Sequence, residues 1–156
     1  MKSIWQSVLG REVPLRAREP IPFAVETLKA WSRHYTIVYL TGRPETTRDL
    51  TIAQLERFGF PIENVEMAMI ALEDWHKGRV NEARRELLSS ISQRHNFVRV
   101  VGDFPGYFTL YKQFDIPDRI GLLLSERHSP QDFINKGATR VIESWETLVD
   151  DLPKPI

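Results

Sequence analysis

The stretch YTIVYLTGRPETTRDL, residues 35–50, decides how the rest of the sequence is interpreted. Its apolar run Ile37–Leu40 is rich in β-branched and aromatic residues, without the alternation of a half-exposed strand, which is typical of a strand covered on both faces. Gly42 permits a tight turn, and Pro44 suits the first turn of a helix because its missing N–H has no partner to lose there. The stretch therefore predicts a buried strand, a sharp turn and a helix.

This order of elements would place polar groups where anions bind. The Thr41 hydroxyl and the backbone N–H groups around Gly42 and Arg43 would lie at the carboxyl edge of a parallel sheet, facing a helix N-terminus. Two interpretations stay open from these residues alone. Either the segment binds phosphate, or Thr41 caps the turn and the Arg43 side chain is solvated.

The composition is that of one globular domain of ordinary size. At 156 residues the chain can bury its own core, and we expect a single domain, 1–156, with an extended N-terminal segment, 1–22, and a core at 23–156. Because 21 Lys and Arg balance 21 Asp and Glu, the overall charge predicts no binding to nucleic acid or to an anionic membrane. The lack of Cys excludes disulfides, thiol nucleophiles and thiolate zinc sites. No segment has the length of a membrane span or a secretory signal, and we expect a cytoplasmic protein.

Strands and helices are expected to alternate along the chain. Helical spacing or helix-favouring composition is found in 24–31, 52–58, 78–93, 108–114, 130–136 and 145–152. In 78–93 the spacing predicts a buried stripe of Val80, Ala83, Leu87 and Ile91. Extended or apolar segments are found at 36–40, 62–70, 97–103, 119–124 and 139–143. Such alternation predicts an α/β fold, with an open, mostly parallel three-layer sheet and helices on both faces. Ligands sit beyond the carboxyl ends of strands in such sheets, which makes Thr41, Asp103 and Ser125 candidates.

Two segments, VYLTGRP at 38–44 and VRVVGDFPGYFTLYKQFDIP at 98–117, resemble the haloacid dehalogenase superfamily of phosphatases, and most closely its lipin-type and related phosphatase branch. The resemblance covers roughly residue 20 to the end. It implies a Rossmann-like fold, phosphate monoester hydrolysis and Mg²⁺ as the cofactor. Since the spacing between elements leaves no room for the large cap domain usual in this family, we expect an open site that suits a large substrate or a protein partner covering it.

The resemblance assigns catalytic roles to Thr41 and Lys77. Thr41 matches the second motif, in which its hydroxyl and the amides of Gly42 and Arg43 hold the phosphoryl oxygens. Lys77, in DWHKGRV, matches the third-motif lysine, which balances the charge of phosphate and nucleophile. Arg84 is the rival for that role, although its flat fork is a poorer substitute for a compact ammonium.

The remaining two motifs depart from the family pattern. Asp103 matches the first acid of the fourth motif, a hard oxygen ligand for Mg²⁺, but Tyr107 stands at the later acidic position, so the metal would be held weakly or not at all. No aspartate precedes Asp49, so the Asp-x-Asp motif that supplies the nucleophile and the proton-transferring acid is missing. Either the chain begins after that strand or the protein is a degenerate member, and Tyr107 favours degeneracy. We expect SIWQSVL, 3–9, to fill the gap as a strand or to pack over it as a helix.

Three functions stay open, of which the first is the best single choice. It is a phosphatase-type hydrolase acting on a phosphorylated small molecule, with activity impaired or absent in this chain. The second is a non-catalytic module that keeps the phosphate site. The third is a partner-binding domain, which requires that Trp5, Phe104, Tyr107 and Phe108 form one exposed patch.

Overall fold

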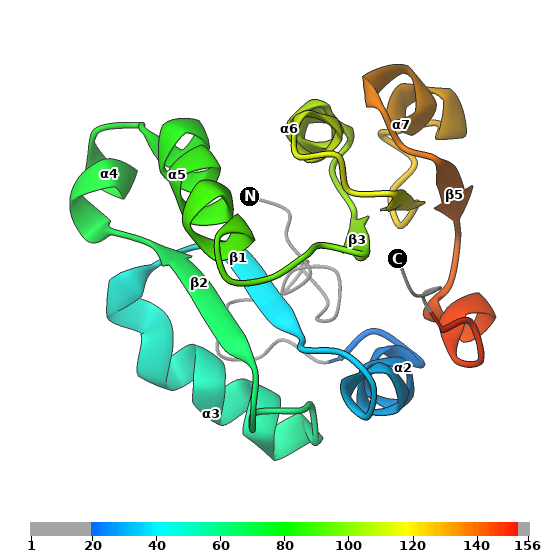
Figure 1. Ribbon diagram of the computed structural model, residues 1–156, viewed down its shortest axis with the longest axis horizontal. Helices are drawn as coiled ribbons and strands as arrows, with labels where there is room; N and C mark the ends of the chain where they lie inside the picture. The colour runs from blue at the N-terminus through cyan, green and yellow to red at the C-terminus, as the bar shows by residue number, and fades with distance from the viewer. Residues whose placement is uncertain (1–19, 153–156) are drawn as a thin grey trace.

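The computed structural model describes residues 20–152, which form an α/β fold (Figure 1). The α-helices are α2 (Ala24–Ser32), α3 (Arg48–Phe58), α4 (Leu72–His76), α5 (Val80–Ser92), α6 (Phe108–Gln113) and α7 (Pro130–Lys136). The strands are β1 (Val38–Pro44), β2 (Glu66–Ile70), β3 (Arg99–Gly102), β4 (Asp118–Leu122) and β5 (Arg140–Ile142). Short 3₁₀ helices are η2 (Glu45–Thr47), η3 (Pro105–Tyr107) and η4 (Trp145–Leu148). The predicted alternation of strands and helices is confirmed.

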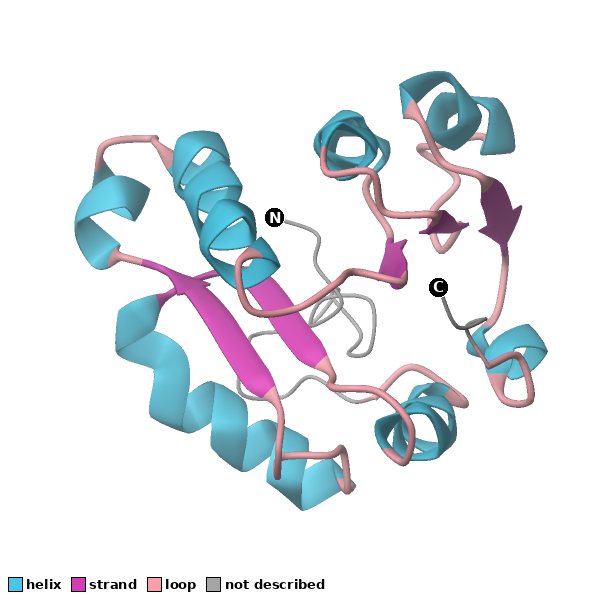
Figure 2. Ribbon diagram, in the orientation of Figure 1, coloured by secondary structure: helices cyan, strands magenta, loops and turns pink. Residues whose placement is uncertain are grey.

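The strands pair in two parallel sheets, whereas the sequence predicts one. β1 pairs with β2, and β3 pairs with β4, which in turn pairs with β5. Figure 2 shows the two groups of strands apart, and β1 and β3 are not hydrogen-bonded to each other. Within residues 20–152, β1 and β3 therefore each have a neighbouring strand on one edge only.

Helices cover both faces of the strands, and neighbouring residues of a strand pack on opposite faces. Tyr39 joins an apolar cluster with α2, α3 and η4, whereas Leu40 joins a cluster with α5, α6 and α7. Val101 and Val100 of β3 are divided in the same way. The unbroken apolar run before Thr41 follows from this arrangement, because a strand buried on both faces presents no side to water.

The turn predicted at Thr41–Pro44 is instead part of β1. Gly42 is buried in the strand, and Pro44 is its last residue, in an extended conformation with φ −68° and ψ 149°. The register of β1 against β2 shifts between Leu40 and Pro44, so an irregularity in the strand replaces the sharp turn. The prediction that Pro44 lies in the first turn of a helix is wrong, since η2 comes after it and α3 begins only at Arg48.

Two helix ends have capping residues of the usual types. Gly59 ends α3 in the left-handed conformation, at φ 87°. Ser144 accepts a hydrogen bond from the Glu146 N–H as a cap, but the helix that follows is the short 3₁₀ helix η4 in place of the expected longer one. Helix α4 has no counterpart among the sequence predictions.

Several expectations concern parts of the chain or surface properties. SIWQSVL at 3–9, like the rest of 1–19, lies outside the described residues, so the expected N-terminal segment 1–22 is described only at 20–22.

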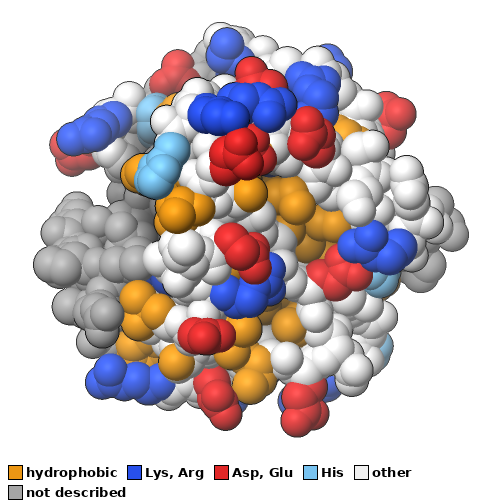
Figure 3. Space-filling view, turned by 90° about the vertical axis from the view of Figure 1, so that its left-hand side faces the viewer, with side chains coloured by type: hydrophobic (Ala, Val, Ile, Leu, Met, Phe, Trp, Pro, Cys, Tyr) orange, Lys and Arg blue, Asp and Glu red, His pale blue; other side chains and the backbone are white. Residues whose placement is uncertain are grey.

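No helix within 20–152 is long and apolar enough to cross a membrane. Figure 3 shows acidic and basic side chains interspersed on the face that it displays, in keeping with the balanced net charge.

Candidate functional site

Thr41 lies fully buried towards the carboxyl end of β1. Its Oγ1 accepts a hydrogen bond from the Arg43 backbone N–H at 3.1 Å. That bond uses a lone pair of the hydroxyl, so the hydroxyl proton can still be donated to an anion. The Arg43 N–H, by contrast, is already engaged with Thr41.

The Arg43 side chain is buried and does not extend into solvent. It is 4% exposed, and its Nη1 donates to Thr51 Oγ1 and to Gln54 Oε1, both at 2.9 Å. Because Thr51 and Gln54 belong to α3, the guanidinium fastens that helix to β1. The expectation of a solvated Arg43 is wrong, and its side chain is directed to α3.

Arg84 is the most unusual charged residue of the described chain. It lies on the buried face of α5 with no exposed surface, and its Cζ stacks 3.6 Å from the centroid of the Tyr107 ring. Its Nε, Nη1 and Nη2 atoms are all buried and have no hydrogen-bond acceptor among the described residues. A guanidinium carries five N–H donors, so this side chain keeps a large unused capacity to bind an anion.

Tyr107 and Tyr111 interact electrostatically with this guanidinium, and Asp103 interacts with Tyr111. We call these four residues the Arg84 cluster. Burial lowers the pKa of Arg84 because it disfavours the charged form, while Tyr111 and Tyr107 oppose that effect. Burial also raises the pKa of Tyr111, which interacts electrostatically with Arg84, Tyr107 and Asp103. An arginine nevertheless keeps its charge at neutral pH, so the cluster holds a buried cation.

Asp103 directly follows β3 and is 4% exposed, as expected for a strand-end residue. Mg²⁺ prefers an octahedral shell of oxygens, usually with one or two carboxylates and bound waters. Within residues 20–152, no group of three or more His, Cys, Asp or Glu side chains could hold a metal ion. One carboxylate in a cluster that already contains a guanidinium does not fit Mg²⁺, and we derive no reaction step through it.

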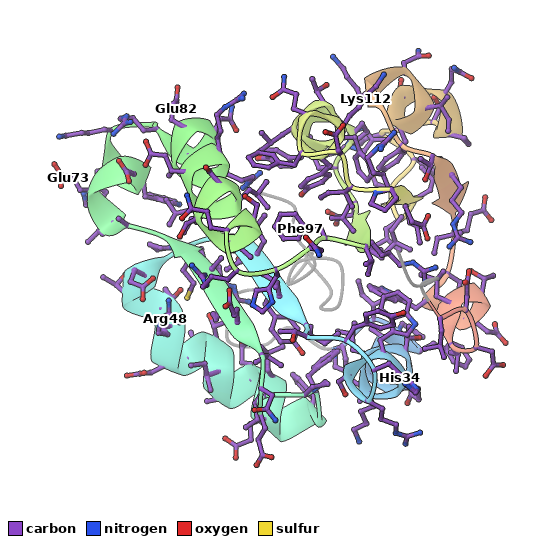
Figure 4. The ribbon with its side chains drawn as sticks, viewed as in Figure 1. His34, Arg48, Glu73, Glu82, Phe97 and Lys112 are labelled. Carbon is purple, nitrogen blue, oxygen red and sulfur yellow. The ribbon has the colours of Figure 1, made fainter. Side chains whose placement is uncertain are left out.

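Lys77 lies apart from the Arg84 cluster, at the end of α4. Its side chain is 62% exposed, and its Nζ pairs with Glu73 Oε1 at 2.7 Å. Figure 4 shows Glu73 at the outer edge of the molecule, whereas Phe97 lies in its middle. Of the two rivals for the phosphate-facing cation, Arg84 is the one that the fold brings into the same cluster as Asp103.

The aromatic residues near Asp103 do not form the exposed patch that a partner-binding domain would need. Phe108 is fully buried and therefore contributes to no exposed patch, and Trp5 lies outside the described residues. The Phe104 ring lies 5.0 Å from that of Tyr107 and 5.7 Å from that of His128. A hollow of about 330 Å³ adjoins Phe104 and Tyr107 and is also lined by Asn81, Arg85, Gly106, Thr109, Leu110 and Gln113.

Sequence reasoning named Arg84 only as a rival and did not anticipate its burial. The predicted apolar face of α5 was Val80, Ala83, Leu87 and Ile91, but the buried residues are Ala83, Arg84, Leu88 and Ile91. The signal was present, because residues 84, 88 and 91 share one face of a helix by their spacing. An arginine at a core position of an apolar stripe indicates a buried charge.

Comparison of the chain with models of protein families, with curated proteins and with solved structures finds no match.

Proposed function

We propose that this chain is a phosphatase-type domain of the haloacid dehalogenase kind whose site binds the phosphate group of a phosphate monoester. The observation that carries the proposal is the fully buried Arg84, whose guanidinium nitrogens have no acceptor among the described residues. Burying such a charge without partners is costly. A phosphate offers several acceptor oxygens and matches the geometry of the guanidinium fork.

In this proposal the two parallel sheets are the halves of one three-layer, Rossmann-like arrangement. Thr41 and Asp103 each stand towards the carboxyl end of an inner strand, and Figure 1 shows β1 and β3 both rising towards the upper half of the view. Ligands of such folds bind at this edge. Arg84 would bind two phosphate oxygens, and the Thr41 hydroxyl would donate to a third.

Binding, and not turnover, is the activity that these residues support. Hydrolysis by the family's covalent route needs a carboxylate nucleophile and a second acid to transfer the proton. No aspartate precedes Asp49 in this sequence, and Asp49 itself is exposed in the first turn of α3. The residues of this chain therefore supply phosphate binding in the proposal, and a non-catalytic phosphate-binding module is the alternative function.

The binding proposal is tested by the thermal stability of the full chain with inorganic phosphate, against chloride at equal ionic strength. A ligand that binds only the folded state raises the melting temperature. We expect a rise for the unchanged protein and no rise for Arg84→Met, which keeps the side-chain volume but removes the donors.

Two further variants locate the cation. Arg85→Met changes the next residue of the same helix, which is exposed and donates to Gln113, and it should keep the full shift. Lys77→Met should also keep it. A shift that survives in Arg84→Met but is lost in Lys77→Met would assign the site to Lys77 and contradict the proposal.

Turnover is tested separately with an aryl phosphate and Mg²⁺. We expect no phosphate release above the uncatalysed rate. Release that is abolished by Arg84→Met would show that the chain uses another nucleophile and is an active hydrolase.

A further inference from the structure

The hollow of about 330 Å³ beside Phe104 and Tyr107 lies between two helices, and we call it the α5–α6 hollow. Side chains of α5 line one side of it and side chains of α6 line another. Phe104, Gly106 and Tyr107, in and before η3, line a third side. Figure 1 shows α5 and α6 in the upper half of the view, with their axes side by side. The volume is at the lower end of the range found for ligand pockets, about 300–1,000 Å³.

Two aromatic rings form the wall of the hollow at η3. The Phe104 ring lies 5.0 Å from the Tyr107 ring and 5.7 Å from the His128 ring, so neighbours on two sides hold it in position. Phe104 and Tyr107 are both only partly buried, which leaves aromatic surface open to the hollow. Such a surface favours a flat ring as its partner, because aromatic rings attract one another beyond the effect of buried area.

Gly106 keeps the wall beside Phe104 free of a second side chain. A Cβ atom at position 106 would lie 2.8 Å from Phe104 Cε1, too close for two carbon atoms unless the ring moves. Gly106 is not among the glycines with positive φ, so the backbone does not require a glycine there. The lack of a side chain at this position instead gives the Phe104 ring its place in the wall.

Amide side chains from both helices supply the polar groups of the hollow, Asn81 from α5 and Gln113 from α6. Gln113 Oε1 accepts a hydrogen bond from Arg85 Nη1 at 2.8 Å, which leaves the amide N–H groups of Gln113 without an acceptor among the described residues. No Asp or Glu is among the described residues that line the hollow. Since amides both donate and accept, they suit a ligand with a polar edge of the same kind.

We propose that the α5–α6 hollow binds an aromatic ring with hydrogen-bonding groups on its edge, as the organic part of the phosphate monoester. This inference rests on the proposed function for the position of the phosphate. Tyr107 connects the two places, because it lines the hollow while the Arg84 guanidinium lies 3.6 Å from the centroid of its ring. An aromatic ester can therefore place its ring against Phe104 and its phosphate near Arg84, whereas an aliphatic ester has no face to stack.

The ring site is tested without phosphate, by NMR titration of the full chain with benzamide, which has a flat ring and an amide edge. We expect the side-chain amide signals of Asn81 and Gln113 and the backbone N–H signal of Gly106 to shift and to saturate. Cyclohexanecarboxamide has the same amide but no flat ring, and it should bind about tenfold more weakly. Equal binding of the two amides, or no shift at these three residues, would overturn the proposal.

Phe104→Leu tests which ring provides the stacking surface. It removes the aromatic face but keeps an apolar side chain, so the preference for benzamide over cyclohexanecarboxamide should fall to about one. Phe58→Leu, at a partly buried position of α3 that does not line the hollow, is the matched control and should keep the preference. If Phe104→Leu does not fold, Gly106→Ala serves instead, because its Cβ displaces the Phe104 ring. A preference that is retained in the folded variant would overturn the proposal.

Phenyl phosphate and cyclohexyl phosphate test the link to the proposed function. We expect phenyl phosphate to bind about tenfold more tightly than cyclohexyl phosphate, with inorganic phosphate also raising the melting temperature. If inorganic phosphate binds but the two esters bind equally, this inference fails and the proposed function stands. If benzamide binds in the hollow but inorganic phosphate does not bind, the proposed function fails, and with it the assignment of the ring to a phosphate monoester.

Discussion

Arg84 shows how one residue can carry a functional assignment. It is an arginine in a core position of α5, stacked on Tyr107, and its buried nitrogens have no hydrogen-bond acceptor of good geometry among the described residues. A residue placed in this way lowers the stability of the unliganded protein. In the proposed function, a phosphate supplies the acceptors that the described residues do not offer to Arg84.

The stability of Arg84→Met follows from this view. We expect a net rise of about 1 kcal/mol in the free energy of unfolding in phosphate-free buffer, because methionine fills the space without an unpaired charge. This net value already includes the loss of the cation–π contact, worth about 1–2 kcal/mol. Urea denaturation of the two proteins measures the difference.

Arg85→Met is the control and should change the free energy of unfolding by no more than about 0.5 kcal/mol, because Arg85 is exposed. A loss of about 3 kcal/mol or more in Arg84→Met would show that Arg84 is a well-partnered structural residue. The argument for an anion would then fail.

At the scale of the elements, a network of charges ties together the three strands of the second sheet. Arg99 of β3 is 6% exposed in its side chain and donates to Asp118 of β4 at 2.7 Å and to Asp151 at 3.1 Å. Arg140 of β5 pairs with the same two carboxylates at 2.9 and 2.8 Å. Arg99 also lies 5.0 Å from the Trp31 ring, which connects the network to α2.

Asp118→Asn should therefore destabilise the protein, by about 2 kcal/mol. The substitution removes the charge that faces Arg99 and Arg140, and breaking a buried pair costs more than breaking an exposed one. Glu73→Gln, which breaks the exposed pair with Lys77, is the matched control and should cost about 0.5 kcal/mol or less. Equal effects of the two substitutions in thermal or urea unfolding would contradict the structural role of the network.

The elements were largely predictable from the sequence, but their assembly was not. Apolar runs and helical spacing located the strands and helices, because the buried face of each element requires apolar residues at a regular spacing along the sequence. The division into two sheets depends on which strand edges meet, and β-strand edges leave no mark in the pattern of side chains. The bulge that carries β1 through Thr41 and Gly42 was missed for the same reason, since Gly and Pro suggest a turn as readily as an irregular strand end.

The site was predictable only in part. The order of strand ends placed Thr41 and Asp103 at the edge of the strands, whereas the choice between Lys77 and Arg84 needed the fold. The spacing of Arg84 with Leu88 and Ile91 is compatible with a buried arginine, but the equally regular spacing of Val80, Ala83 and Leu87 predicts a different buried face of the same helix.

At the scale of the whole molecule, the free energy of unfolding should decrease at acidic pH. Hydrogen bonds from Arg94 and His95 hold the pKa of Glu66 below its ordinary value of 4.5. Burial raises the pKa of Asp151, but Arg140 and Arg99 lower it more, so it also lies below its ordinary value, 3.8. In both cases the unfolded chain takes up a proton at higher pH than the folded protein.

The contribution of each group is complete above its unfolded pKa and is lost as the pH falls through its folded pKa. We expect the free energy of unfolding to fall with decreasing pH below about 4.5, and urea unfolding at several pH values measures the slope. Glu66→Gln should make the fall shallower. An unchanged slope in that variant would show that Glu66 does not gain its partners on folding.

The most direct test of the central claim, that Arg84 binds phosphate, is the NMR signal of its side-chain Nε–Hε group during titration of the full chain with inorganic phosphate. Arg84→Lys assigns the signal by its disappearance. We predict that the Arg84 signal shifts and saturates with phosphate, while that of Arg85 stays in place. An Arg84 signal that does not move at phosphate concentrations that raise the melting temperature would contradict the account.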